Sequence, residues 1–309
     1  MVARWSDPLS TARLPGAEMW QAFTVTRIDA SLMQGRIERT WHAEVPSADS
    51  PRPRALVVVL HGAGSEGSRY LDLQGWAETA RREGIVVVAP DALPHDPSRA
   101  PRFRDNPRVW NSGRPEPGET RAQLDEAVFL QAIGEALAER GVLIDPTRRF
   151  LVGHSNGAAL TWKLLAEEPE QWTAGVSVAG GLVNLPLRHG PIRPLLAIFG
   201  DADPMLPLAG GTVALPWGMT RTMPPVFETL GRWAESEGFS ATPVERLEEA
   251  GVTRYRWNPL LSAIVVHGQG HEWPGGQDSG LPPEMIGPQT KHFDATAEAW
   301  RFLQHQEHR

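Results

Sequence analysis

The sequence contains no cysteine, and this absence excludes disulfide bonds, cysteine-ligated zinc and a cysteine nucleophile. It also lacks a long apolar segment near its start, where residues 1–19 are interrupted by Asp7, Pro8, Arg13 and Glu18. A signal peptide or a membrane-spanning helix needs an unbroken apolar run, so we expect neither a membrane partner nor a secretion signal. The sequence as it stands therefore predicts a cytoplasmic protein, and a secreted protein whose leader has been removed is the alternative.

A basic surface is missing as well. The formal net charge is −7, and the 30 basic residues are spread along the chain rather than clustered. Because binding to phosphate backbones requires a basic patch, nucleic acid is not expected as a partner. Hydrophobic residues make up 41% of the sequence, which is ordinary for a globular chain with a large core.

Short runs rich in β-branched residues recur along the chain and are typical of strands that are buried on both faces. These runs cover residues 55–60, 85–89, 150–152, 175–179, 195–199 and 262–266. Helical patterns lie over residues 127–141, 162–168, 226–237 and 292–304. The alternation predicts an α/β fold with a mostly parallel sheet and helices on both faces.

The ends of the chain complete this expected organisation. Residues 23–28 and 36–45 alternate apolar and polar side chains, which predicts antiparallel strands at the N-terminal edge of the sheet. We expect a single domain over residues 22–309, preceded by an N-terminal extension of residues 1–21. The long segment 91–119 is rich in proline and arginine, and we expect it to lie over the rim of the functional site.

A possible nucleophile lies between a predicted strand and a predicted helix, in Gly153-His154-Ser155-Asn156-Gly157. Glycines on both sides of Ser155 allow a sharp turn from strand to helix, which exposes the hydroxyl at the carboxyl edge of the sheet. A serine hydroxyl needs an imidazole to remove its proton and a carboxylate to orient that imidazole. The motif alone is common by chance, and an ordinary turn with a capping serine is the alternative.

Both partners occur later in the chain, each after a predicted strand, in the order Asp and then His. Asp203 is favoured over Asp201 because Asp201, nearer the strand end, could instead cap the turn. His271 is favoured over His267 because it lies in a glycine-flanked loop that can reach the serine. The two histidines have a spacing seen in metal pairs, but no third ligand is evident, so no metal and no organic cofactor are expected.

An acyl-transfer site also needs backbone N–H groups directed at the developing oxyanion. One is expected from Asn156, which follows the serine, and the other from His61-Gly62-Ala63-Gly64-Ser65, which follows the third predicted strand. Ala63 is the preferred second donor, with Gly64 as the alternative.

Several motifs together resemble the polyhydroxybutyrate depolymerase and feruloyl esterase-like α/β-hydrolases, including the LpqC-type esterases. The resemblance extends over about residues 39–303. Its segments are Leu60-His61-Gly62, Trp110-Asn111-Ser112-Gly113, residues 125–130, Gly153–Ala158, residues 203–211 and, most specifically, Gly270-His271-Glu272-Trp273-Pro274-Gly275-Gly276. It implies the α/β-hydrolase fold, a Ser155–Asp203–His271 triad, and substrate contacts by Trp273 and Trp110. A buried core residue is the alternative for Trp273.

The sequence departs from this family in two respects. Many members carry paired cysteines, and some carry a separate polymer-binding domain, and neither is present here. We therefore expect a serine carboxylic ester hydrolase that acts on small or oligomeric esters, of short-chain, 3-hydroxyacyl or feruloyl type. A serine peptidase of the same fold and a non-catalytic binding protein are the alternatives.

Overall fold

The computed structural model describes residues 22–47, 52–113, 120–181 and 193–306. The predicted extension of residues 1–21 lies outside these ranges. Among the described residues, no helix has the length and apolar character needed to cross a bilayer.

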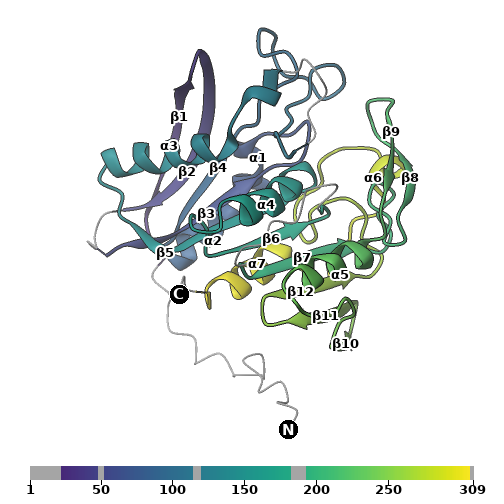
Figure 1. Ribbon diagram of the computed structural model, residues 1–309. Helices are drawn as coiled ribbons and strands as arrows, with labels where there is room; N and C mark the ends of the chain where they lie inside the picture. The colour runs from purple at the N-terminus through teal and green to yellow at the C-terminus, as the bar shows by residue number, and fades with distance from the viewer. Residues whose placement is uncertain (1–21, 48–51, 114–119, 182–192, 307–309) are drawn as a thin grey trace.

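One large sheet organises the chain (Figure 1). Six neighbouring strands run parallel, in the spatial order β4-β3-β5-β6-β7-β12. Their bounds are β3 Arg54–Leu60, β4 Val86–Pro90, β5 Ile144–His154, β6 Ala174–Val178, β7 Leu195–Gly200 and β12 Leu261–Val266. These strands coincide with the six β-branched runs, so the predicted α/β fold with a mostly parallel sheet is confirmed.

Antiparallel strands extend both edges of the sheet. At the first edge, β1 (Val25–Gln34) pairs with β2 (Ile37–Pro46), as predicted, and β2 continues onto β4. At the other edge, β11 (Val252–Asn258) and β10 (Glu245–Glu249) were not predicted from the sequence. β10 lies at the edge of the sheet, where a strand packs little apolar surface. Its sequence is therefore mostly charged and lacks the apolar pattern that predicts a strand.

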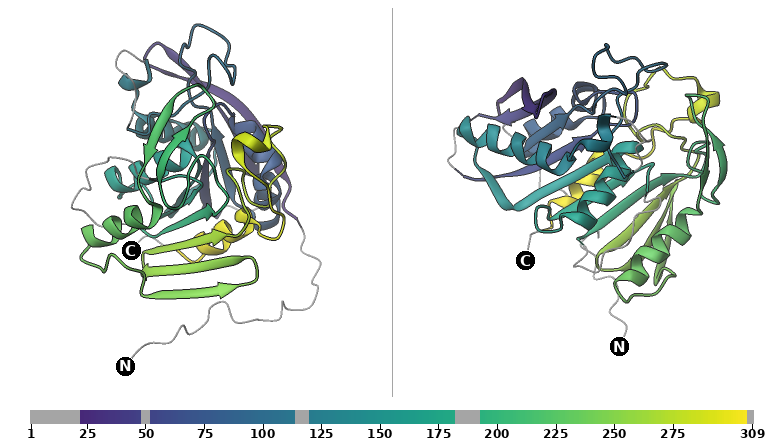
Figure 2. Two further views of the ribbon diagram at one scale, coloured as in Figure 1. Left: turned by 90° about the vertical axis from the view of Figure 1, so that its right-hand side faces the viewer. Right: turned by 45° about the horizontal axis from the view of Figure 1, so that its top comes forward.

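Helices cover both faces of the sheet (Figure 2). The bounds are α1 Gly67–Leu73, α2 Trp76–Glu83, α3 Glu126–Glu139, α4 Asn156–Glu167, α5 Val226–Ser236, α6 Pro283–Ile286 and α7 Ala295–Leu303. Side chains of α3, α4 and α5 belong to one hydrophobic cluster, and those of α1, α2 and α7 belong to a second. The alternation of β3 explains the two layers: Leu56, Val58 and Leu60 join the first cluster, whereas neighbouring residues of the same strand join the second.

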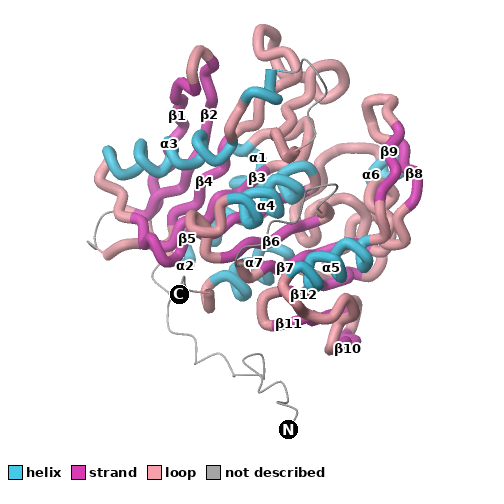
Figure 3. Tube along the Cα trace, viewed as in Figure 1, coloured by secondary structure: helices cyan, strands magenta, loops and turns pink. Residues whose placement is uncertain are grey.

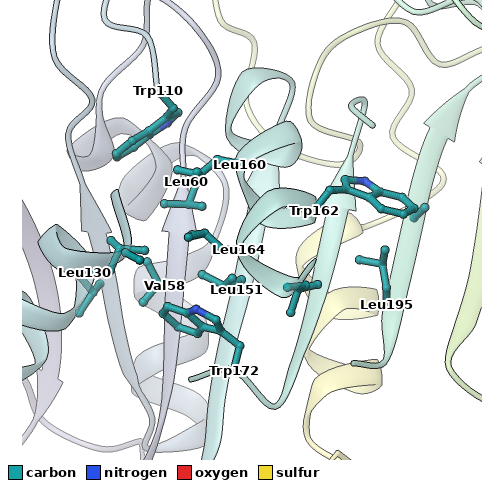
Figure 4. Close-up of a cluster of buried hydrophobic side chains, with 14 of the residues drawn as sticks. Val58, Leu60, Trp110, Leu130, Leu151, Leu160, Trp162, Leu164, Trp172 and Leu195 are labelled. Carbon is teal, nitrogen blue, oxygen red and sulfur yellow. The ribbon is translucent and has the colours of Figure 1, made fainter. Parts of the chain in front are cut away.

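Close packing against α4 fixes the centre of the sheet (Figure 4). Val58 and Leu60 of β3 lie in the same buried cluster as Leu160 and Leu164 of α4. All four side chains are almost fully buried, and each contributes roughly 1.5–3 kcal/mol by leaving water. This contact holds the start of α4, and therefore Ser155, at a fixed height above the sheet.

Loops gather beyond the carboxyl ends of the parallel strands (Figure 3). There the sheet ends of β5, β7 and β12 lead into the segments that carry the predicted Ser, Asp and His residues. A separate hairpin of β8 (Gly211–Ala214) and β9 (Thr220–Met223) also stands at this end of the molecule (Figure 1). In α/β sheets this edge is where ligands bind.

Candidate active site

Ser155 lies on a strained turn between β5 and α4. Its φ is 52° and its ψ is −114°, a backbone conformation that residues other than glycine rarely adopt. Its amide donates to Val178 O at 2.9 Å, which fixes the turn on the neighbouring strand β6. A Cβ atom at Gly153 would lie 2.2 Å from Gly157 O, and one at Gly157 would lie 2.2 Å from Leu60 O. The two glycines of the motif are therefore required by the close approach of three backbone segments.

The predicted Ser, His and Asp residues form one continuous hydrogen-bond series. His271 Nε2 lies 2.8 Å from Ser155 Oγ, and His271 Nδ1 lies 2.6 Å from Asp203 Oδ2. A carboxylate can only accept, so Nδ1 carries a proton and, in the neutral ring, Nε2 is free to accept from the serine hydroxyl. The other carboxylate oxygen, Asp203 Oδ1, accepts the amides of Met205 and Leu206 at 2.8 and 2.9 Å. Asp203 is thus held from its own loop as well as by the imidazole.

The electrostatics of this pair favour an ionised carboxylate beside a basic imidazole. Burial alone would disfavour the charged form of His271, but the charge of Asp203 and its hydrogen bond outweigh burial and raise the pKa of the imidazole. Burial likewise acts against the Asp203 carboxylate, but the charge and hydrogen bond of His271, together with two backbone amides, lower its pKa. His271 is therefore a stronger base than an isolated histidine.

The alternative residues, Asp201 and His267, form a separate pair. His267 Nδ1 lies 2.8 Å from Asp201 Oδ2, and its Nε2 lies 3.0 Å from Thr253 Oγ1 on β11. Asp201 Oδ1 accepts the amide of Gly268 at 2.6 Å. This pair repeats the Asp–His geometry, but Thr253 is only 2% exposed. The arrangement therefore links the ends of β7, β11 and β12 and offers no accessible hydroxyl.

The backbone amides of the loop after β3 distinguish Ala63 from Gly64. The amide of Gly62 donates to Tyr70 Oη, that of Gly64 to Arg108 O, and that of Ser65 to Gly62 O. Among the described residues, the Ala63 amide has no such acceptor. The amide of Asn156 is the first of α4 and has no partner within the helix. These two free donors lie beside Ser155 on the wall of one cavity.

Trp110 connects the segments that carry the two donors. Its indole Nε1 donates to His61 O at 2.9 Å, and its backbone amide donates to Asn156 Oδ1 at 2.7 Å. The Asn156 side chain in turn donates to Ser112 Oγ at 2.9 Å. Trp110 is fully buried and does not line the cavity. Its predicted contact with substrate is therefore wrong, because its ring faces the loop backbone from behind.

Trp273 also lies behind the cavity wall. It is 1% exposed, its indole donates to Thr296 Oγ1 at 3.1 Å, and its ring meets Tyr70 and Trp76 edge-on at centroid distances of 6.1 and 6.5 Å. It is absent from the cavity lining, so the alternative interpretation as a core residue is the correct one. The tryptophan supports the segment that carries His271.

A buried relay that sequence reasoning missed joins the loop after β3 to the segment of His271. Gly62 donates its amide to Tyr70 Oη at 3.1 Å, and Tyr70 Oη lies 2.5 Å from His154 Nδ1. His154 Nε2 lies 2.8 Å from the backbone oxygen of His271. Burial, reinforced by the charge of His271, lowers the pKa of His154 to about 3, so its ring is neutral and donates from Nε2.

The cavity has a volume of about 510 Å³ and is lined by Ala63, Ser155, Asn156 and His271. The segment predicted to cover the rim contributes to it: residues 101–103, Arg108 and several neighbours line the same cavity. This expectation is confirmed for its described part, residues 91–113. The hairpin β8–β9 supplies another part of the wall.

Sequence comparison relates the chain to known hydrolases. Residues 57–304 match the Alpha/beta hydrolase family. NocK of Nocardia uniformis subsp. tsuyamanensis, whose name describes it as an esterase, is 31% identical over 284 residues, which cover 85% of this chain and 77% of NocK. Feruloyl esterase C of Emericella nidulans is 26% identical over 180 residues, which cover 56% of this chain and 58% of that protein.

Two further similarities are more limited. Poly(3-hydroxyalkanoate) depolymerase C of Paucimonas lemoignei is 29% identical over 138 residues, which cover 44% of this chain but only 30% of the depolymerase. The structure of acetyl xylan esterase from Aspergillus awamori superposes with a TM-score of 0.58 at 15% identity, covering 80% of this chain and 94% of that chain. The structural similarity concerns the fold alone.

Proposed function

This chain belongs to the alpha/beta hydrolase family, and we propose that it hydrolyses carboxylic esters with Ser155 as nucleophile, His271 as base and Asp203 as the orienting carboxylate. One observation carries the proposal: the hydrogen-bond series from Ser155 to Asp203 opens into the same cavity as the amides of Ala63 and Asn156, which have no acceptor among the described residues. Relatives named as esterases support an ester as the substrate.

In the first half-reaction, Ser155 Oγ attacks the ester carbonyl carbon and its proton passes to His271 Nε2. The negative charge on the former carbonyl oxygen is stabilised by the amides of Ala63 and Asn156, at about 2.7–4 kcal/mol for each donor. The carbon–oxygen bond to the alcohol then breaks, and His271 gives its proton to the departing oxygen. Asp203 stabilises the imidazolium in between and keeps Nδ1 protonated.

Water completes the cycle by the same route. His271 Nε2 takes a proton from a water molecule as its oxygen attacks the acyl carbon. The second oxyanion occupies the position of the first, between Ala63 and Asn156. When this intermediate collapses, the proton returns to Ser155 Oγ and the carboxylic acid is released.

Activity-based labelling tests the proposal directly. A fluorophosphonate should modify Ser155, and 4-nitrophenyl butyrate should be hydrolysed, whereas the corresponding 4-nitroanilide should react far more slowly. Mass spectrometry of the labelled peptide identifies the modified residue, and absorbance measures both turnovers. Faster hydrolysis of amides than of esters would instead indicate a peptidase, and a protein that is neither labelled nor active would be a binding protein.

The pH profile should report the ionisation of His271. Only the neutral imidazole accepts the proton of Ser155, so kcat/KM should fall as pH decreases through its pKa, which Asp203 raises above the ordinary histidine value. We expect the midpoint of this fall to lie above pH ~6.5, the ordinary value for a histidine. The measurement is kcat/KM for a neutral ester between about pH 5 and 9.

Other buried histidines do not account for this fall in kcat/KM. Burial lowers the pKa of His61 to about 4 and that of His154 to about 3, so both stay neutral throughout this range. The variant Asp203→Asn removes the charge that raises the pKa of His271. The kcat/KM of its residual activity should therefore fall with a midpoint at lower pH than in the wild type. An unchanged midpoint in this variant would contradict the assignment of the pH dependence to His271.

A further inference from the structure

The charge of the cavity wall is opposite to that of the whole chain. The protein carries a formal net charge of −7. Four arginines line the cavity against two carboxylates; they are Arg69, Arg102, Arg108 and Arg221, against Glu66 and Glu272. A concave wall with excess positive charge attracts anions and raises their local concentration.

Two of these arginines have no side-chain partner of any kind in the described part of the chain. Arg108 lies 3.6 Å from Asp91 Oδ2 and donates to Ala92 O, so its charge is compensated. Arg102 and Arg221 are exposed, and neither side chain has a hydrogen bond or an ion pair with any residue in the described part of the chain. An exposed guanidinium on the wall of a substrate cavity is available to a ligand.

The two arginines come from segments that are joined to each other. Arg102 precedes Phe103, whose backbone oxygen accepts Trp217 Nε1 at 2.6 Å, and the two rings lie 5.6 Å apart. Trp217 lies in the connection between β8 and β9, and Arg221 is in β9, paired with Val213 of β8. The Phe103–Trp217 contact therefore joins the segment of Arg102 to the hairpin of Arg221, and both arginines line the same cavity.

Opposite charges on the wall limit what such a site could hold. Glu272 accepts hydrogen bonds from the amide and the hydroxyl of Ser279, so it is fixed as an acceptor on the cavity wall. Glu66 adds a second negative charge. A ligand with one negative charge suits this rim better than a dianion, and a carboxylate matches the planar fork of a guanidinium.

We propose that the preferred substrate is an ester that also carries a free carboxylate, which Arg102 and Arg221 bind at the rim while Ser155 attacks the ester carbonyl. Arg69, whose side chain donates a long hydrogen bond to Ser279 O at 3.4 Å, adds to the positive field. This inference rests on the proposed esterase function and specifies its substrate class. The carboxylate can belong to the acyl part or to the alcohol part of the ester.

Matched pairs of charged and neutral esters test the proposal. For the acyl side, mono-4-nitrophenyl adipate is compared with 4-nitrophenyl methyl adipate. For the alcohol side, 4-butyryloxybenzoate is compared with its methyl ester, and the released phenol is measured by chromatography. We expect the wild type to prefer the charged ester in at least one pair, mainly through a lower KM.

The double variant Arg102→Gln/Arg221→Gln should reduce the charged-to-neutral ratio of kcat/KM by about tenfold in that pair. About 0.5 M NaCl should reduce the same ratio in the wild type by screening the guanidinium charges. Arg232→Gln is the matched control, because Arg232 lies on α5, is exposed and does not line the cavity; its ratio should equal that of the wild type.

The outcomes separate this inference from the function on which it rests. A wild type that hydrolyses none of the four esters would refute the proposed function. Hydrolysis of the neutral esters without any charged preference would overturn the carboxylate site alone. So would a double variant that loses activity equally on charged and neutral esters, with the thermal unfolding midpoint checking that it is folded.

Discussion

Replacing Ser155 with alanine should reduce ester hydrolysis by about 10⁴–10⁶-fold. Alanine removes the oxygen that would form the acyl-enzyme, while the amides of Ala63 and Asn156 and the base His271 stay in place. The residual rate should reflect substrate binding and oxyanion stabilisation alone. Turnover of 4-nitrophenyl butyrate at saturating substrate measures the loss.

The control for this variant is a test that the protein is still folded. Alanine is close in size to serine and keeps a Cβ atom at the strained position, so circular dichroism and the thermal midpoint should remain near those of the wild type. The variant should also resist labelling by a fluorophosphonate. A folded Ser155→Ala protein with undiminished turnover would refute the nucleophile assignment.

Replacing Asp203 with asparagine should reduce kcat by about 10³–10⁴-fold. An amide can present its NH₂ group to His271 Nδ1 and so favour the tautomer with the proton on Nε2, which cannot accept from Ser155. The charge that stabilises the imidazolium is lost as well. Steady-state kinetics should show this loss mainly in kcat, because Asp203 lies behind His271 and does not line the cavity.

The neighbouring Asp201 provides a matched comparison within the same turn. It makes an equivalent hydrogen bond to a histidine, but its partner His267 does not contact Ser155. Asp201→Asn should therefore change kcat by no more than about threefold, as expected for an exposed hydrogen bond of small energy. A larger loss in Asp201→Asn than in Asp203→Asn would transfer the acid role to Asp201.

The central strands of the sheet could be predicted from the sequence because the signal for each strand lies in a few consecutive residues. A strand buried on both faces must be apolar at every position, so β3 and β4 are visible as uninterrupted runs. Short peripheral elements were not predicted. Helix α2 has only eight residues, and β8 and β9 have four each, too few to establish a period against the background of loops.

The positions of Ser155, Asp203 and His271 could be predicted because each follows a buried strand, and the carboxyl ends of parallel strands meet at one edge. The free amide of Ala63 could only be preferred over that of Gly64, because the deciding contact, Gly64 N–H to Arg108 O, joins segments far apart in the sequence.

Residues that act through tertiary contacts left no local signal. Tyr70 lies in a helix that was not predicted, 84 residues from the His154 that it contacts. Trp110 and Trp273 showed the opposite difficulty: their motifs indicate proximity to the site, but a motif does not distinguish a ring that faces the cavity from one that supports its wall. Only the burial of their side chains decides between these alternatives.

The backbone of Ser155 also links turnover to thermal resistance. A residue other than glycine in such a conformation costs about 1–3 kcal/mol of folding free energy. That cost is a substantial fraction of the net stability of an ordinary domain, about 5–15 kcal/mol. The bond to Val178 and the packing of α4 keep the turn in place despite it. The fold is therefore less robust than its core would allow, and the residue that weakens it is the one on which the proposed reaction depends.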